Sequence, residues 1–289
     1  MSPGFDRADI VRSKNSFFGD TWANCKRWLL KFINSPPLLV MNLVQPVIFL
    51  FMFTEVFGQV ATGAISGVLG GSVNYVTYLL PAIAIQVSMA TAQGAGGGLV
   101  RDMDEWIFEK VMVYPMSKTA VFLGKTLSEI LRIVVQTGII LGLGVVLGAE
   151  IVTGFLGALG IIGVGILFAL FYISVTTSVA MATQDSETMM SIMMPIMFPL
   201  LFLSSAFLPL ETVPNWIVTF AKFNPVTYGI DAARSIILGE DVMTVVDVTS
   251  FTGIWNAIVP AVAVLSVFIL VFGGLAVYMI RRGTSPDVR

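Results

Sequence analysis

The chain is 289 residues long, and its composition excludes an ordinary water-soluble globular domain. Hydrophobic residues make up 56% of it and charged residues only 12%, and the mean hydropathy is +0.89. A typical soluble domain is about 45–50% apolar and about 25% charged. The complete lack of His excludes His-based metal sites and Ser-His catalysis, and the single Cys25 excludes an internal disulfide. The net charge of −2 offers no basic excess, so no nucleic-acid partner is expected.

Residues 1–36 precede the first long apolar stretch, and they contain a predicted amphipathic helix over 16–33. Its basic residues lie mostly away from its apolar face, which is typical of a helix in the cytoplasmic membrane interface. We therefore expect 1–36 to be a cytoplasmic segment in contact with membrane lipids, and not a cleaved signal peptide. The alternative is a soluble helix that packs on a partner. The apolar face is formed by residues at steps of three and four: Phe18, Trp22, Cys25, Leu29 and Phe32.

Six apolar stretches follow that are long enough to cross a bilayer, which takes about 20 residues per helix. A Gly- and Ser-rich loop over 58–74 is expected between the first two, and the glycines of 94–98 are expected to loosen or end the second helix or to permit close packing. The sequence has no β-barrel alternation. Residues 37–289 are therefore predicted to form one all-α membrane domain, a bundle of six transmembrane helices. The spans are predicted near 37–57, 75–98, 128–149, 155–183, 188–210 and 254–280.

Lys and Arg are concentrated in alternate connections between these spans. The N-terminal segment, the loop 99–127 and the C-terminus carry most of them, whereas the outer segment 211–253 carries only Lys222 and Arg234. Cytoplasmic loops of membrane proteins are enriched in these residues. The pattern predicts a multi-pass plasma-membrane protein with both termini in the cytoplasm.

The cytoplasmic loop 99–127 is predicted to contain a short amphipathic helix that ends at Pro115. Apolar residues recur there one turn apart among charged neighbours, so the segment is too charged to enter lipid. Exposed Trp106, Phe108 and Val111 beside charged residues are typical of a surface that docks onto a soluble partner. The alternative is a loop that only joins two spans.

The outer segment 211–240 predicts two short helices in place of an extended loop. Asn224 is a favourable N-cap, and Pro225 suits the first position of the second helix. The segment is too apolar for a free loop and too interrupted for a span. We expect it to be re-entrant between the fifth and sixth spans, or to cap the outer end of the bundle. Asp231 and Arg234 lie three residues apart and are expected to form a structural ion pair.

The deep parts of the predicted spans hold no charged residue, which argues against an ion-coupled carrier. The run Gly124-Lys125-Thr126 lacks the earlier Gly and the preceding strand of a phosphate loop, so no nucleotide site is expected in this chain. Neutral polar groups in spans usually form hydrogen bonds between helices. Five of them are also candidates for lining a translocation path: Asn42, Gln45, Gln86, Ser204 and Ser205.

Two runs of the sequence resemble motifs of the membrane subunits of type-2 ABC transporters, the permease family that includes daunorubicin-resistance and polysaccharide-export permeases. The cytoplasmic run 107–117, followed by Gly124 and Lys125, looks like the coupling segment of the family. The outer run 223–234 looks like its signature before the last span, and the order of helices is similar. One departure is Trp106-Ile107, where the family often has a small Gly-Thr pair.

The resemblance implies a permease without a cofactor of its own, paired with a second permease copy and with ABC ATPase subunits that bind ATP and Mg. It implies export of a hydrophobic drug, a lipid or a glycan, and a separate permease chain suggests a prokaryotic membrane. A passive channel or uncoupled carrier, and a membrane-anchored assembly or regulatory protein, are the competing readings. The ATPase-coupling residues would be Phe108, Glu109, Val111 and Pro115 within the run that resembles the family, together with the exposed Trp106 just before it. The structural residues of the outer motif would be Asn224, Pro225, Tyr228, Asp231 and Arg234.

Overall fold

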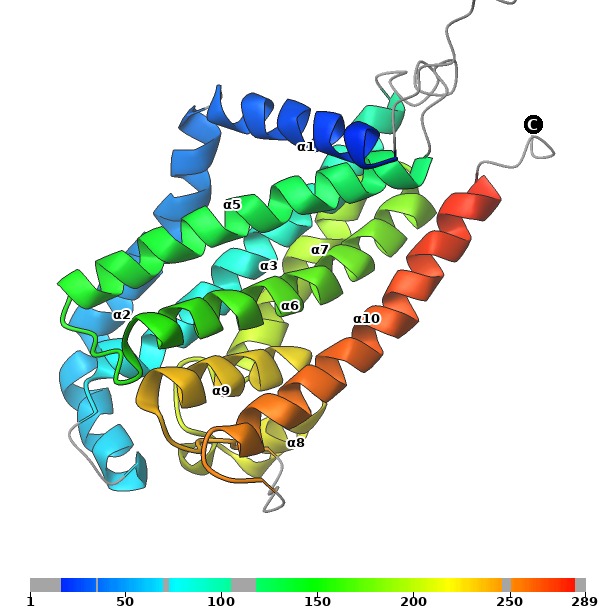
Figure 1. Ribbon diagram of the computed structural model, residues 1–289. Coiled ribbons are helices and arrows are strands. Elements are labelled where there is room, and N and C mark those ends of the chain that lie inside the picture. Colours follow the sequence, from blue (N-terminus) through cyan, green and yellow to red (C-terminus); the bar gives the residue numbers. More distant parts are fainter. Residues whose placement is uncertain (1–16, 35, 70–72, 105–117, 246–250, 284–289) are drawn as a thin grey trace, which may run out of the picture.

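The computed structural model describes residues 17–34, 36–69, 73–104, 118–245 and 251–283. Every regular element in these ranges is a helix, and the helices pack into one bundle (Figure 1). The predicted all-α class is therefore confirmed for this part of the chain. In chain order the elements are α1 (Phe17–Ile33), α2 (Pro36–Leu69), α3 (Tyr75–Asp104), α5 (Lys118–Val146), α6 (Gly154–Thr183), α7 (Ser186–Phe202), the 3-10 turn η2 (Leu210–Thr212), α8 (Asn215–Phe223), α9 (Pro225–Leu238) and α10 (Trp255–Gly283).

Four stretches in the described ranges are long and apolar enough to cross a membrane. They are Tyr75–Gly98 in α3, Leu123–Val146 in α5, Gly154–Thr183 in α6 and Trp255–Met279 in α10. In the folded chain, 94% of the apolar part of the α3 stretch is buried, whereas only 11% of that of the α10 stretch is buried. α3 packs against α2, α5, α6, α7 and α9, so it is the core of the bundle, while α10 presents an apolar surface to its surroundings.

The other two expected spans differ from the prediction. α2 continues as a helix to Leu69, so most of the expected loop 58–74 is helical. Its glycines are spaced singly among Ala, Val and Ile, and an isolated Gly costs a helix only about 1 kcal/mol. α7 ends at Phe202 and is 17 residues long, shorter than the expected span 188–210. Pro195 and Pro199 lie inside it and weaken its continuation.

The glycines near the end of α3 permit close packing and do not end the helix. α3 runs through 94–98 without interruption. A Cβ atom on Gly96 would lie 2.9 Å from both the Cβ and the backbone oxygen of Thr176 in α6. Only glycine lets α3 and α6 approach this closely, because a Cβ atom at this position would lie closer to Thr176 than packed atoms allow.

The two short helices expected before the last span are present. The N-cap of α9 is Asn224, whose side chain accepts a hydrogen bond from the backbone N–H of Val226, and Pro225 occupies its first turn. Gly239 ends the helix with a φ of +74°, a left-handed conformation that glycine adopts freely. α9 is buried against α3, α6 and α10.

α1 lies alongside α5 (Figure 1), and α1 and α5 are among the most extensively packed helix pairs in the structure. The predicted apolar face of α1 is divided between two environments. Cys25 and Phe32 are buried in the protein, whereas Phe18 and Trp22 are 81% and 59% exposed. One side of α1 therefore packs on the bundle, while aromatic side chains on another side stay exposed.

Candidate functional site

The two helices that flank the predicted coupling segment end and begin on the same side of the bundle as α1. α3 ends at Asp104 and α5 begins at Lys118, and Figure 1 shows both of these ends close to the α1 side. The coupling residues Trp106, Phe108, Glu109, Val111 and Pro115 fall within 105–117, outside the described residues. Their role stays a prediction, but the structure describes the two helices, α3 and α5, that the segment connects.

A single glycine of α5 allows α1 to pack directly on it. A Cβ on Gly124 would lie 2.5 Å from the backbone oxygen of Thr21 and 2.7 Å from the Cβ of Asn24. These are atoms of the first half of α1, and a backbone oxygen cannot swing away as a flexible side chain can. Cys25 is completely buried at this contact, and burial raises the pKa of its thiol. Gly124 belongs to the sequence that resembled the coupling segment, so that resemblance coincides with a real helix contact.

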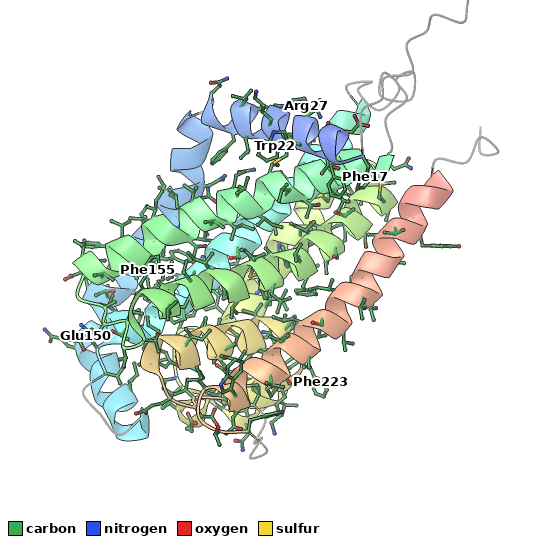
Figure 2. The ribbon with its side chains drawn as sticks, in the orientation of Figure 1. Phe17, Trp22, Arg27, Glu150, Phe155 and Phe223 are labelled. Atoms are coloured by element: carbon green, nitrogen blue, oxygen red, sulfur yellow. The ribbon has the colours of Figure 1, made fainter. Side chains whose placement is uncertain are left out.

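Cations and aromatic rings cluster beside this contact. Trp28 of α1 has three cations over its ring, with Lys125 Nζ 4.7 Å, Lys31 Nζ 5.0 Å and Arg27 Cζ 5.4 Å from the ring centroid. Figure 2 shows Arg27 on α1 at the upper edge of the bundle. A cation within about 6 Å of an aromatic ring is attracted by the negative face of the ring. The cluster thus connects α1 to the first turns of α5.

A second ionic group lies one turn further along α5. Arg132 NH1 donates to Glu129 Oε2 at 2.7 Å, and its Cζ lies 4.3 Å from the ring centroid of Phe32 in α1. The carboxylate side chain is only 3% exposed and that of the arginine 12%. The two residues form an ion pair that is largely shielded from solvent. They line a cavity of about 320 Å³ between α1, α2, α3, α5 and α7.

A buried polar network occupies the opposite end of the bundle. Asp231 of α9 is fully buried, yet both of its carboxylate oxygens accept hydrogen bonds. Oδ1 accepts from Ser205 Oγ at 2.5 Å, and Oδ2 accepts from the backbone N–H and the Oγ1 of Thr244 at 3.0 and 2.6 Å. Arg234 NH1 lies 3.5 Å from Oδ1. The predicted ion pair is present, but its closest hydrogen bonds come from hydroxyl groups.

Arg234 connects α9 to two other parts of the chain. It is 1% exposed, and its NH2 donates to the backbone oxygen of Ser205 at 2.7 Å. Its Nε donates to the backbone oxygen of Tyr78 in α3 at 3.3 Å, and its Cζ stacks 3.7 Å from the Tyr78 ring centroid. A buried charge is costly unless it is fully hydrogen-bonded. This guanidinium meets that requirement with groups from three segments and so fixes α9 against the end of α3.

The other three residues of the outer motif position α9 itself. Asn224 caps the helix, and its amide Nδ2 also donates to the backbone oxygens of Leu200 and Leu203 at the end of α7, at 2.6 and 3.1 Å. The Tyr228 hydroxyl donates to the backbone oxygen of Lys222 in α8 at 2.9 Å, and Pro225 opens the helix. Together they connect α7, α8 and α9.

The five candidate path residues are distributed over both ends of the bundle. Asn42 lines the cavity beside α1, and Gln45 is exposed on α2. Gln86 is buried in α3, and neither atom of its amide has a hydrogen-bond partner among the described residues. Ser204 and Ser205 lie beyond the end of α7, where Ser205 belongs to the Asp231 network. The structure therefore does not bring them together at one site, and a shared path stays a prediction.

Sequence reasoning missed several partners at both ends. Thr244 joins the Asp231 network from beyond the end of α9 and Tyr78 contacts Arg234 from α3, and no helical spacing signals either contact. Trp28 was not among the predicted residues of the α1 face, although a tryptophan within a basic helix could have indicated a cation–π cluster. Lys125 was considered as a phosphate-loop residue and as part of the run that resembles the coupling segment, but its contact with Trp28 joins two helices and has no local signal.

The comparisons with known proteins agree with this architecture. Residues 19–238 match the family model described as "ABC-2 type transporter". The chain is 28% identical over 213 residues to "Daunorubicin resistance ABC transporter permease protein DrrB1" of Streptomyces coeruleorubidus, covering 74% of this chain and 73% of that protein. It is 24% identical over 230 residues to "Probable doxorubicin resistance ABC transporter permease protein DrrC" of Mycobacterium tuberculosis, covering 79% and 80%.

The family match begins within α1, ends at the last residue of α9, and includes both polar ends of the bundle. It extends over far more than half of the chain. The chain therefore belongs to the ABC-2 type transporter family and is a membrane permease subunit, of a kind that lacks a nucleotide-binding domain.

Proposed function

We propose that this permease exports hydrophobic, anthracycline-like small molecules, using ATP that a separate ABC ATPase subunit hydrolyses. The observation that carries the proposal is the pair of drug-resistance permeases that align with about three quarters of the chain. A substrate that is mainly hydrophobic also fits an interior whose predicted spans contain no charged residues in their deep parts. Lipids and glycans are the alternative cargoes that a transport assay would separate.

The proposed topology has six spans with both termini in the cytoplasm. α2 has 34 residues, enough to cross the bilayer with length to spare. α7 has 17 residues and is about 26 Å long, slightly less than the roughly 30 Å hydrocarbon core. The chain beyond α7 would complete the crossing, with α8 and α9 dipping back at the outer face. The fully buried Asp231 network supports this, since backbone and charge at membrane depth need shelter by protein.

α3 is the element best placed to transmit force from the ATPase. Its 30 residues extend over about 45 Å. One end leads into the predicted coupling segment 105–117, and Tyr78 near the other end holds Arg234 of α9. A push on the coupling segment would therefore reach the outer network through one rigid helix. Conformational coupling over such distances requires an element of this kind that both sites contact.

The proposal also includes a second permease copy, either identical or related. Apolar side chains such as Val135 and Ile139 are exposed on α5, and Leu270 and Val271 are exposed on α10. These surfaces would be covered by lipid or by the second copy. A cleft between two copies would give a hydrophobic substrate a route from the inner leaflet. The translocation path would then lie between the copies and not within a single bundle.

Assembly with an ATPase is the feature that separates this function from a passive channel. The affinity-tagged chain, co-expressed with the ABC ATPase encoded nearest to it, should retain that ATPase through detergent purification. The purified permease alone should not bind ATP saturably, whereas the complex should hydrolyse it. A permease that never retains an ATPase, yet releases a loaded dye from liposomes without ATP, would contradict the proposal and favour a passive pathway.

A further inference from the structure

The cavity beside α1 has the chemistry of an anion site. Its wall contains two cations, Lys31 and Arg132, against one carboxylate, Glu129. That carboxylate is already paired with Arg132 at 2.7 Å. Lys125 adds a further cation behind Trp28, at 4.7 Å from the ring centroid. The charge is therefore unbalanced in favour of a negatively charged occupant, and a cationic amphiphile would be repelled.

Hydrogen-bond donors without acceptors point to the same occupant. The indole Nε1 of Trp28 and the Nε of Arg132 are buried, and neither has a hydrogen-bond partner among the described residues. Both residues line the cavity. Buried donors normally find an acceptor, because a buried donor without a hydrogen bond costs about 1–3 kcal/mol of stability. A ligand with several acceptor oxygens, such as a phosphodiester, would satisfy both.

Three glycines of α3 provide the space for a ligand. Gly94, Gly97 and Gly98 line the cavity, and a Cβ built on Gly94 would meet no atom within 4 Å. Phe32 and Met190 add apolar surface to the same wall. A site with cations, unpaired donors and an apolar wall fits a molecule that is anionic at one end and hydrophobic at the other.

We infer that this cavity binds the phosphate headgroup of an anionic phospholipid from the leaflet in which α1 lies. The inference goes beyond the export function and requires only that the α1 side of the bundle faces that leaflet. Basic pockets between membrane helices on the cytoplasmic side suit anionic headgroups, and the leaflet there carries a negative surface potential. The bound lipid would contact α1, α3 and α5, and the last two of these helices flank the predicted coupling segment. The lipid therefore fills the space between α1 and the core of the bundle and can dissociate from it.

Native mass spectrometry of the full-length protein tests this directly. The purified, delipidated permease is mixed with equal amounts of phosphatidylglycerol and phosphatidylcholine in detergent. We expect preferential retention of phosphatidylglycerol. The soluble headgroup glycerophosphoglycerol, added at the same concentration, should not displace the lipid, because it lacks the acyl chains. Displacement by the soluble headgroup would reassign the cavity to a soluble phosphoester and overturn the lipid assignment.

Two variants probe the cavity, and each has a matched control. Gly94→Leu fills the open space without a charge change, and Gly274→Leu in α10 is also a helical glycine with no atom within 4 Å. Lys31→Gln removes one cation of the wall, and Lys26→Gln makes the same change at an exposed position of α1 outside the cavity. We expect Gly94→Leu to abolish the preference, and Lys31→Gln to weaken phosphatidylglycerol binding about fivefold. Both controls should behave as the unmodified protein.

Two results would overturn the inference. The first is a preference for phosphatidylglycerol that survives in Gly94→Leu, because the lipid would then bind elsewhere. The second is an equal loss in Lys26→Gln and Lys31→Gln, because binding would then be a general attraction of anionic lipid to a basic helix. Monodisperse size-exclusion profiles for all four variants would exclude misfolding as the cause of any loss.

Discussion

At the scale of single residues, the Asp231 network places two charged side chains, Asp231 and Arg234, inside the protein. The Asp231 carboxylate accepts three hydrogen bonds from Ser205 and Thr244 and faces the guanidinium of Arg234. Buried ion pairs contribute little net stability compared with apolar residues, but the loss of one partner alone is costly. The arrangement therefore specifies one position of α9 relative to α3, at a site that is buried from solvent.

The variant Asp231→Asn tests this role. The amide keeps the size of the side chain but removes the negative charge opposite Arg234, and its NH₂ group cannot accept the hydrogen bonds that one carboxylate oxygen accepts. We expect a loss of about 3 kcal/mol in stability, seen as a lower thermal unfolding midpoint in detergent. Glu240→Gln removes a carboxylate charge at an exposed position close by and should have no effect. Equal midpoints for the two variants would mean that Asp231 is not a structural residue.

The contact at Gly124 can be tested with the single cysteine of the chain as a reporter. In Gly124→Leu the new side chain would collide with the backbone of α1 at Thr21, so α1 must move away from α5. Cys25 is buried there and its pKa is raised by burial, so the unmodified protein should react slowly with N-ethylmaleimide. We expect the variant to react at least several times faster. Gly138→Leu, at a helical position of α5 with no atom within 4 Å, should leave the rate unchanged, and a slow reaction in both would contradict the assignment.

At the scale of elements, local sequence chemistry predicted the ends of α9 but not the end of α2 or the contacts between distant helices. Asn224 and Pro225 marked the start of α9 because capping depends on neighbouring residues alone. The extension of α2 to Leu69 was missed because Gly and Ser were taken to break a helix that Ala, Val and Ile sustain. The contact of Arg234 with Tyr78 joins residues 156 positions apart, and only the packed bundle defines it.

The coupling segment is the element whose prediction matters most for function. Phe108 and Val111 would fill a groove on the ATPase, and Glu109 would make the charged contact beside them. We expect Glu109→Arg, or Phe108→Ala with Val111→Ala, to weaken retention of the ATPase by about 2 kcal/mol, roughly thirtyfold. The permease should still reach the membrane, because these residues belong to the charged segment between α3 and α5 that is predicted to lie outside the bilayer. Pull-down of the ATPase measures the change. Undiminished binding in both variants would make the segment a simple connector and direct attention to α1.

At the scale of the whole molecule, the two polar groups lie at opposite ends of the bundle, and we propose that they mark its inner and outer faces. Figure 2 shows Arg27 on α1 and Glu150 at the connection between α5 and α6, on opposite sides of the bundle. The basic residues of α1 predict that its side faces the cytoplasm. Force would then enter near the α1 side and reach the outer network through α3.

Cysteine labelling tests this orientation. Glu150→Cys and Lys26→Cys are introduced separately into a Cys25→Ala background, both at exposed positions. An impermeant maleimide should label Glu150→Cys in intact cells but label Lys26→Cys only after the cells are permeabilised. Labelling of both positions from the outside would exclude a cytoplasmic α1.

The claim that this chain converts ATP hydrolysis by another subunit into transport is tested most directly in proteoliposomes. The permease and its ATPase are reconstituted together, and the initial rate of daunorubicin movement is followed by its fluorescence. We predict movement with ATP and Mg, none with a non-hydrolysable ATP analogue, and none when either protein is omitted. Movement at the same rate without the ATPase, or without hydrolysable ATP, would contradict the claim.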